Sequence, residues 1–308
     1  MKSILVALTN IPTYGEKNAA TGLWLGEAAE FVDEVGKRGY AVDYVSPQGG
    51  YVPLDPRSMK RTYADAATFA LYRSQDFKER ALARSMRPDD VEAELKAIRQ
   101  AELDAMRDEW RAKLYSGEIS VWSLFEDYAM LGDSRTSGFT YYGYLAPERV
   151  FADSGATIKK VIDHLEELVA LNPSIIFLTY GINDVGIGYW PTPEDYVNEI
   201  NNTLALLKEH LPNATVYVCS IIPALEPAFK RGPAWREIPD YNDAVRAFCE
   251  ENGTPYVDIT QLCEEHTDLY QDDGVHLLGG FYPLWGTELI AEVYDYVFAL
   301  ESNESAAE

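Results

Sequence analysis

The chain has 308 residues, 47% of them hydrophobic, and its 50 acidic and 26 basic side chains give a formal net charge of −24. This length and apolar content suffice for one large or two ordinary globular domains with a buried core. The negative field repels phosphate backbones and anionic lipid surfaces, so we expect no nucleic-acid partner and no membrane partner.

The N-terminal stretch MKSILVALTNIPTYG carries an apolar run that is too short for a secretory signal. No stretch of the sequence approaches the roughly 18 apolar residues that a membrane span needs. We therefore expect a cytoplasmic protein. Cys219, Cys249 and Cys263 are odd in number and far apart, a pattern that indicates neither a disulfide framework nor a zinc site. No metal and no cofactor are expected.

The first elements form a βαβ pattern. Residues 3–8, SILVAL, are typical of a buried strand, and the amphipathic segment 21–40 predicts a helix closed by Gly39. Residues 41–47, AVDYVSP, predict a second strand. A strand, a helix and a strand in this order favour parallel pairing.

The composition shifts to Ala, Glu, Arg, Lys and Leu between Ala64 and about Leu114, with an interruption at RPDD, which predicts two helices. Apolar residues recur at roughly helical spacing in the second helix. We expect this stripe to pack in a core; it consists of Leu95, Ile98, Met106, Trp110 and Leu114.

Strands and helices alternate after Gly117. Helical patterns such as 157–171 and 195–211 separate most of the strand candidates. Strands joined by helices of this length indicate a doubly wound α/β sheet, in which ligands bind beyond the carboxyl ends of the strands. The five strand candidates are YAMLGD, RVFADS, IIFLTY, TVYVCS and YVDI.

Polar or glycine residues follow three of these strands. Ser134 follows the first, Gly155 the second and Asn183 the third, so all three are expected at one sheet edge. GDS alone is a common turn sequence, but this coincidence of position argues against a mere turn. Near the C-terminus, Asp273 precedes His276 by three residues. A carboxylate at this separation can accept the ring Nδ1–H and turn Nε2 outward, as a general base requires.

These residues supply the roles of acyl transfer. Ser134 is the expected nucleophile, His276 the base that removes its proton, and Asp273 the carboxylate that fixes the imidazole tautomer. The backbone N–H groups of Ser134 and Gly155, together with the side-chain amide of Asn183, are the expected oxyanion hole.

Residues 93–300 resemble the SGNH/GDSL hydrolases, and residues 301–308 form an acidic tail. The four family blocks are matched by GDS with Ser134, DSGAT with Gly155, GIND with Asn183, and DGVH with Asp273 and His276. The resemblance implies a flavodoxin-like three-layer α/β/α sandwich with a parallel sheet of about five strands. It also implies metal-free hydrolysis of an ester through an acyl-enzyme, with a small-molecule or carbohydrate ester as the substrate.

Four further residues are candidates for substrate binding. Arg135 stands where a small or apolar residue is frequent in the family, and is expected either to bind an anionic or polar substrate group or to pair with the acidic surface. Asp184 lies beside Asn183. Tyr189 and Trp190 follow this block and could form a sugar-stacking platform or an acyl-pocket wall, or Trp190 could only brace the start of the next helix.

Residues 1–92 resemble the beginning of a DJ-1/PfpI protein of the Hsp31-like branch, through ILVALTNIPTYG, TGLWLGEAAEF and GYAVDYVSPQGG. In that family an acidic residue assists a Cys on a later elbow, and Glu27 matches the acidic position. No matching Cys elbow follows, so we expect a truncated βαβ segment with a helical extension and chemistry confined to residues 93–300.

A serine esterase is therefore the leading interpretation. The alternatives are a non-catalytic, chaperone-like fusion protein and a glyoxalase or deglycase, the latter disfavoured by the missing Cys elbow. An incomplete N-terminal sheet has an unpaired edge that favours self-association, so a homo-oligomer is a further expectation.

Overall fold

The structure, a computed structural model, describes residues 3–307 and the side chains of residues 3–299. It divides the chain into two compact units, Met1–Glu102 and Leu103–Glu308. The expected boundary between residues 92 and 93 falls inside one continuous helix, α3 (Pro88–Tyr115), which belongs in part to each unit. The expected tail begins as a continuation of the last helix, since α10 (Phe281–Ala307) includes residues 301–307, and Glu308 lies outside the described residues.

The N-terminal unit contains the predicted βαβ pattern. Its two principal strands pair in parallel, with Ser3 opposite Ala41 and Ala7 opposite Val45, and they form a two-stranded sheet of their own. The predicted first helix ends before Gly39, whose φ of +80° suits a residue without a side chain. The elements are β1 (Ser3–Ala7), β2 (Thr13–Tyr14), β3 (Ala19–Ala20), α1 (Leu25–Lys37), β4 (Ala41–Val45), α2 (Ala66–Arg73) and a π-helical turn (Phe77–Ala83).

A small core holds this unit together. Leu25 of α1 and Tyr44 of β4 are buried in one cluster with Phe77 and Ala81 of the π-helical turn. The later helical segment therefore covers one face of the strands, which a two-stranded sheet requires because it is marginal alone. The expectation of a buried first strand is wrong: β1 has no buried residue and Leu5 is 47% exposed, because no second layer covers the other face. Glu27 is exposed on α1, and no cysteine occurs before Cys219 in the sequence.

The expectation that the whole apolar stripe of α3 packs in a core is wrong. Leu95 is 60% exposed, Ile98 50% and Met106 59%, whereas Trp110 and Leu114 pack in the core of the C-terminal unit. Trp110 stacks on Tyr294 of α10, with ring centroids 3.8 Å apart. A single neighbouring helix covers only a narrow seam, so regular apolar spacing did not guarantee burial along the full helix.

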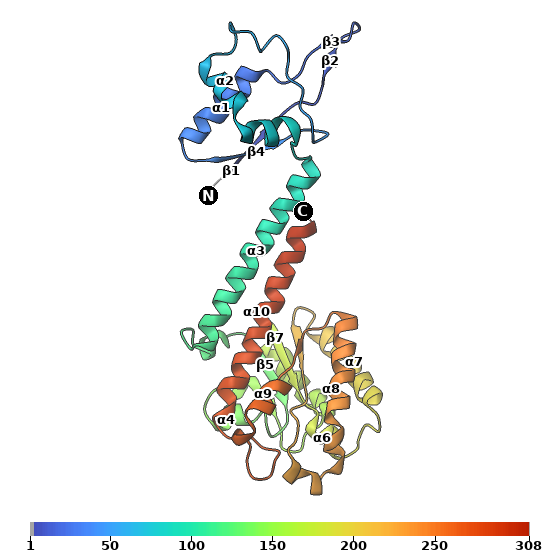
Figure 1. Cartoon of the computed structure of the whole chain (residues 1–308). Coiled ribbons are helices and arrows are strands. Elements are labelled where there is room, and N and C mark those ends of the chain that lie inside the picture. Colours follow the sequence, from blue (N-terminus) through green and yellow to red (C-terminus); the bar gives the residue numbers. More distant parts are fainter. Residues whose placement is uncertain (1–2, 308) are drawn as a thin grey trace. The chain divides into compact units, whose positions relative to one another are not determined.

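The C-terminal unit is built on a five-stranded parallel sheet of order β6-β5-β7-β8-β9 (Figure 1). This order is that of flavodoxin-like doubly wound sheets, whose ligand crevice lies where the strand order reverses, here between β5 and β7. The five predicted strands are confirmed as β5 (Tyr128–Gly132), β6 (Val150–Ala152), β7 (Ile175–Thr179), β8 (Thr215–Cys219) and β9 (Tyr256–Val257).

The sheet is buried on both faces. Ala129 and Leu131 of β5 join one core cluster, whereas Tyr128 and Met130 join the other, because successive strand side chains point to opposite faces. The first cluster includes buried residues of α5, α7 and α8, and the second includes residues of α10. The C-terminal unit is therefore a mixed α/β fold with three layers.

The helices of this unit follow local start and stop signals. Thr192 and Asp195 form a capping box at the start of α7, and Gly253 ends α8 in a left-handed conformation. The α-helices are α4 (Gly138–Tyr141), α5 (Leu165–Leu171), α6 (Ile182–Gly186), α7 (Pro193–His210), α8 (Ile238–Asn252), α9 (Thr260–Glu265) and α10. Short 3₁₀ helices lie at Val121–Leu124, Pro147–Arg149, Ile158–His164, Glu226–Lys230, Pro233–Glu237 and Thr267–Leu269.

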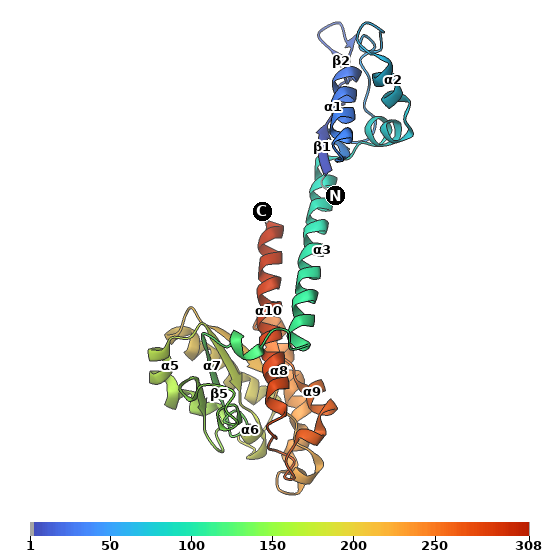
Figure 2. The ribbon, with the colours of Figure 1, turned by 90° about the vertical axis from the view of Figure 1, so that its left-hand side faces the viewer.

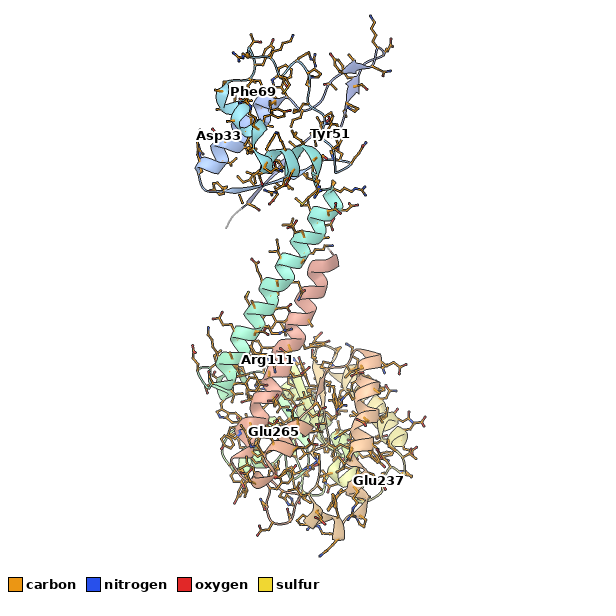
Figure 3. The ribbon with its side chains drawn as sticks, viewed as in Figure 1. Asp33, Tyr51, Phe69, Arg111, Glu237 and Glu265 are labelled. Atoms are coloured by element: carbon orange, nitrogen blue, oxygen red, sulfur yellow. The ribbon has the colours of Figure 1, made fainter. Side chains whose placement is uncertain are left out.

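Helix α10 runs antiparallel to residues 103–115 of α3 (Figure 2). Arg111 of α3, which is labelled in Figure 3, forms an ion pair with Asp295 of α10. In sequence, these two residues directly follow Trp110 and Tyr294, whose rings stack. The C-terminal half of α3 is thereby part of the C-terminal unit.

Candidate active site

Ser134 lies in a tight helical turn directly after β5. The backbone N–H of Ser137 donates to the Asp133 carbonyl at 3.1 Å, and the Ser137 hydroxyl donates to the Ser134 carbonyl at 2.7 Å. Gly132 permits this turn: a Cβ there would lie 2.1 Å from the Thr136 hydroxyl and 2.3 Å from that of Thr179. Those two hydroxyls are themselves hydrogen-bonded at 2.6 Å. Glycine is therefore required where the strand meets the turn.

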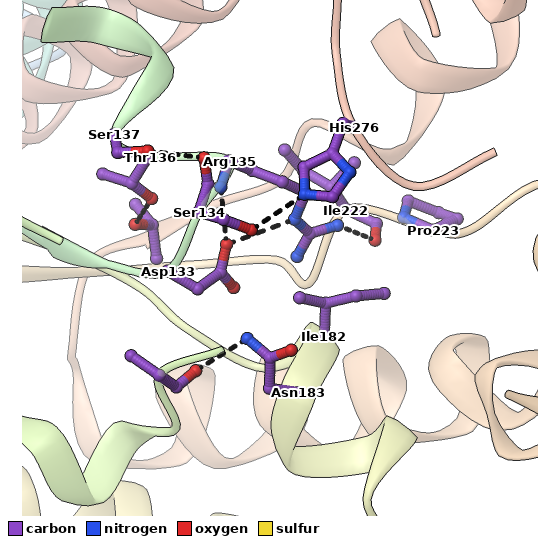
Figure 4. A network of polar contacts seen from close by, with 12 residues as sticks. Asp133, Ser134, Arg135, Thr136, Ser137, Ile182, Asn183, Ile222, Pro223 and His276 are labelled. Atoms are coloured by element: carbon purple, nitrogen blue, oxygen red, sulfur yellow. Dashed lines mark hydrogen bonds and ion pairs between the residues drawn. The ribbon is translucent and has the colours of Figure 1, made fainter. Parts of the chain in front are cut away.

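The structure brings Ser134, His276 and Asp273 together. Ser134 Oγ lies 3.1 Å from His276 Nε2 (Figure 4), and His276 Nδ1 lies 2.6 Å from Asp273 Oδ2. The carboxylate accepts the Nδ1–H, which leaves Nε2 with a lone pair directed at the serine hydroxyl. This tautomer is assigned from the hydrogen-bond network. The arrangement can transfer a proton from Ser134 to His276.

Asp273 is held as an anion. Partial burial raises the pKa of its carboxyl, but hydrogen bonds from the His276 ring and from the backbone N–H groups of His276 and Val275 outweigh burial and lower the pKa to about 2. Arg231 Nη2 lies 3.9 Å from Asp273 Oδ2, and the Arg231 side chain is 60% exposed. The carboxylate can therefore stabilise a cationic imidazole wherever the pH exceeds this value.

Each of the three expected oxyanion donors has an N–H hydrogen that is not used in a hydrogen bond among the described residues. Among the hydrogen bonds within residues 3–307, none uses the backbone N–H of Ser134 or of Gly155. Gly155 is exposed, and its φ of +73° favours glycine. Asn183 Nδ2 donates one hydrogen to the Ala156 carbonyl at 2.8 Å, which fixes the orientation of the amide and leaves its second hydrogen for a ligand.

Two of the expected substrate-binding residues are buried, so that expectation is wrong for them. The Arg135 side chain is 2% exposed; it pairs with Asp133 and donates to the Ile222 carbonyl. Asp184 is fully buried and accepts hydrogen bonds from the Ile158 N–H and the Trp190 indole. Burial raises the pKa of Asp184 to about 6, although these hydrogen bonds oppose the shift. Sequence position alone could not separate a buried charge from an exposed one.

Tyr189 and Trp190 differ in their surroundings. Tyr189 is 49% exposed, whereas Trp190 is partly buried against the core, with its indole bonded to Asp184 and its carbonyl bonded to the Tyr241 hydroxyl. Lys159 Nζ lies 4.8 Å from the Tyr189 ring centroid and 5.0 Å from that of Trp190. Trp190 therefore braces the start of α7, and Tyr189 remains available to a ligand.

Sequence reasoning missed three neighbours of the site: the Ala156 carbonyl that orients Asn183, Lys159 beside the aromatic pair, and Arg231 beside Asp273. Lys159 carried a weak signal because it lies four residues after Gly155. Arg231 carried none, since it lies 42 residues before Asp273 in a segment without a motif.

A model of the GDSL-like Lipase/Acylhydrolase family matches residues 130–279. The matched segment runs from β5 through the loop that carries His276. The match supports a GDSL-like acylhydrolase, that is, a hydrolase acting on esters, in this part of the chain. It does not reach residues 1–92, whose resemblance to DJ-1/PfpI proteins stays a prediction.

The curated relatives include N-acylneuraminate cytidylyltransferases of Streptococcus agalactiae. The protein of serotype III (strain NEM316) is 24% identical over 261 residues, and that of serotype V (strain ATCC BAA-611 / 2603 V/R) is 24% identical over 260 residues. The alignments cover 78% and 77% of this chain but only 59% of each relative. The chain thus spans less than two thirds of the length of these relatives.

Solved structures with a similar fold include GDSL-like proteins. A putative GDSL-like lipase from Parabacteroides merdae is 20% identical, with 54% of this chain and 94% of that chain covered and a TM-score of 0.45. A GDSL-like lipase from Bacteroides thetaiotaomicron is 20% identical, with 64% and 98% covered and a TM-score of 0.42. A mutant of an acetylxylan esterase from Geobacillus stearothermophilus is 17% identical, with 55% and 94% covered and a TM-score of 0.43.

The described part of the chain offers neither a membrane-crossing helix nor a metal-binding cluster. None of its helices is long and apolar enough to cross a membrane. Across residues 3–307, no group of three or more His, Cys, Asp or Glu side chains is arranged to hold a metal ion.

Proposed function

We propose that the C-terminal unit of this chain is an SGNH/GDSL serine hydrolase that cleaves carboxylic esters through an acyl-enzyme. The observation that carries the proposal is the relay of two short contacts, Ser134 Oγ to His276 Nε2 at 3.1 Å and His276 Nδ1 to Asp273 Oδ2 at 2.6 Å. The family match over residues 130–279 supports the same reaction class.

In the first half-reaction, Ser134 Oγ attacks the ester carbonyl carbon while its proton moves to His276 Nε2. Asp273 stabilises the imidazolium that forms. The tetrahedral intermediate then collapses, the bond to the alcohol oxygen breaks, and His276 returns the proton to the departing alcohol. In the second half-reaction His276 takes a proton from water, the hydroxide attacks the acyl-enzyme, and Ser134 is released with its proton restored.

The negative charge of each tetrahedral intermediate is received by the N–H groups of Ser134, Gly155 and Asn183. The second hydrogen of the Asn183 amide is free while the first is bonded to the Ala156 carbonyl. A donor fixed in this way costs no reorganisation when the charge develops. Apart from the attacking water, each step uses groups supplied by this chain.

The proposed substrate is a small-molecule or carbohydrate ester. Tyr189 supports this class because its ring is 49% exposed and lies in the segment that follows Asn183. Aromatic faces offer apolar contact to the flat face of a sugar ring or to an acyl chain. A panel of acetylated sugars and p-nitrophenyl esters of increasing acyl length separates these two uses of the same ring.

Hydrolysis of p-nitrophenyl acetate by purified Ser134→Ala tests the proposal. We expect loss of turnover with a folded chain, because the substitution removes the nucleophile and buries no new polar group; His276→Ala should be nearly as damaging. Ser123→Ala is the matched control, since Ser123 is an exposed serine outside the site. Full activity in soluble, folded Ser134→Ala would refute the proposal and favour the non-catalytic alternative.

A further inference from the structure

A buried arginine follows the nucleophile directly. The Arg135 side chain is 2% exposed, and the carboxylate of Asp133, on the other side of Ser134, is fully buried. Burying two charges is expensive, and such a pair persists only where its geometry compensates or where it has a role besides stability. Asp133 and Arg135 lie on either side of Ser134, the proposed nucleophile.

The two side chains close the turn around Ser134. Asp133 Oδ1 accepts the backbone N–H of Arg135 at 2.9 Å and lies 3.5 Å from Arg135 Nε. The Arg135 carbonyl accepts the hydroxyl of Tyr282 at 2.8 Å. Within the described residues, Asp133 Oδ2 has no hydrogen-bond partner, so the guanidinium is the cation on which this buried carboxylate depends.

Arg135 also reaches beyond the turn. Its Nη1 donates to the Ile222 carbonyl at 2.7 Å, in the loop that follows β8 (Figure 4). That loop is anchored to α8, because the Asn242 side chain bonds both the N–H and the carbonyl of Ile221, at 2.7 and 2.9 Å. The guanidinium therefore ties the nucleophile turn to a fixed point on the next part of the sheet edge.

The same loop supports the segment that carries the base. The Tyr270 hydroxyl donates to the Pro223 carbonyl at 3.0 Å, one residue beyond Ile222. Tyr270 pairs with Leu277, and the Gln271 N–H donates to the His276 carbonyl at 2.8 Å. A continuous set of bonds thus runs from Arg135 through residues 222–223 to the loop that holds His276.

We propose that Arg135 is a positioning residue that sets the placement of Ser134 relative to His276, an inference that rests on the proposed hydrolase function. Arg135 acts through the Asp133 carboxylate and the Ile222 carbonyl and does not touch the substrate. An arginine suits this role because its planar fork donates in two fixed directions, one to each partner, whereas a lysine is a single flexible point charge.

Loss of the tether is expected to misplace Ser134 Oγ relative to His276 Nε2 and to change substrate binding little. A displacement of about 1 Å at a reacting centre costs on the order of 100-fold in rate. We therefore expect Arg135→Met to lower kcat by ~100-fold while KM changes less than threefold, and Arg135→Lys to recover part of that loss because it keeps the charge and one donor.

A double variant distinguishes a folding defect from a loss of Ser134 positioning. Arg135→Met alone leaves a buried, uncompensated carboxylate and is expected to destabilise the fold. Asp133→Asn combined with Arg135→Met removes both charges and keeps an acceptor for the backbone N–H of residue 135. We expect this neutral double variant to melt close to the wild-type temperature and yet to remain at least 30-fold slower in kcat.

The experiment measures kcat, KM, thermal melting and the rate of covalent labelling by a fluorophosphonate for the full chain and each variant. The labelling rate reports activation of Ser134 without a substrate alcohol, and a purely structural role would not change it once the fold is restored. Arg149→Met is the matched control: Arg149 donates to the Tyr128 carbonyl at 2.9 Å, at the opposite end of β5. It should lower stability and leave labelling of the folded fraction unchanged.

A neutral double variant with kcat and labelling rate within threefold of wild type would overturn the inference, as would an Arg135→Lys variant no better than Arg135→Met at equal folded fraction. Slow labelling of the folded double variant with partial rescue by lysine supports it. Failure of the proposed function is distinguishable, because it would appear as an inactive wild type or an active Ser134→Ala.

Discussion

Removal of the Asn183 amide is expected to slow the chemical step with little effect on substrate binding. Asn183 Nδ2 donates one hydrogen to the Ala156 carbonyl at 2.8 Å, and the amide is thereby held with its second hydrogen available to the oxyanion. A carbonyl oxygen of the bound ester carries less negative charge than the tetrahedral oxyanion, so this donor contributes mainly in the transition state.

The size of the expected fall in kcat follows from the loss of one preorganised hydrogen-bond donor out of the three expected. Deleting one donor of this kind costs about 3–4 kcal/mol, which is roughly 10²–10³ in kcat. The N–H groups of Ser134 and Gly155 remain, and they account for the activity that survives. We therefore expect Asn183→Ala to reduce kcat by at least ~100-fold and to change KM by less than threefold.

The assay is steady-state hydrolysis of p-nitrophenyl acetate, with the folded fraction checked by circular dichroism. Asn202→Ala is the matched control, because Asn202 is an exposed asparagine on α7. A rise in KM at unchanged kcat would place Asn183 in ground-state binding and refute the assignment. So would an Asn183→Ala variant within threefold of the control.

Asp273→Asn should lower kcat by ~10⁴-fold, because an amide facing His276 Nδ1 favours the wrong imidazole tautomer, and stopped assays at raised enzyme concentration would detect the residual rate. Asp273, whose pKa is lowered to about 2, is already ionised across the pH range of the assay, so this carboxyl should add no step to the pH profile of wild-type kcat/KM; a step that Asp273→Asn abolishes would contradict this. Asp184 has a folded-state pKa of about 6, above its ordinary 3.8, so its contribution to stability is complete below about pH 4 and is lost as pH rises through 6, about 3 kcal/mol in all. Urea unfolding at pH 4.5 and pH 7 should show a loss in wild type about 2 kcal/mol greater than any change in Asp184→Asn; equal changes in the two proteins would contradict it. EDTA should leave turnover unchanged, and inactivation that added zinc reverses would favour a metallohydrolase.

The strands of the C-terminal unit were predictable because their signals are local. Each is a short apolar run bounded by turn residues, and parallel strands separated by helices have few arrangements. The positions of Ser134 and Asn183 at one sheet edge followed from that topology, and both lie beside the reversal of strand order between β5 and β7. The three-residue spacing of Asp273 and His276 allowed a contact between their side chains, and in the structure Asp273 Oδ2 lies 2.6 Å from His276 Nδ1.

Burial was not predictable where it depends on partners distant in sequence. Arg135 and Asp184 have charged side chains, which are usually exposed. In the structure both are buried, because Arg135 donates a hydrogen bond to the Ile222 carbonyl and Asp184 accepts one from the Ile158 N–H. Conversely, Leu95 and Met106 have helical spacing typical of a core, and they are exposed. Periodicity identifies the apolar face of a helix and says nothing about whether another element covers it.

The proposed reaction requires a covalent intermediate on Ser134. Intact-protein and peptide mass spectrometry of the chain, quenched in acid during turnover of p-nitrophenyl acetate, detects such an intermediate. We predict an acetyl adduct on the peptide that contains Ser134, in amounts that fall to background in Ser134→Ala. An adduct on any other residue, or continued hydrolysis by folded Ser134→Ala, would rule out Ser134 as the nucleophile.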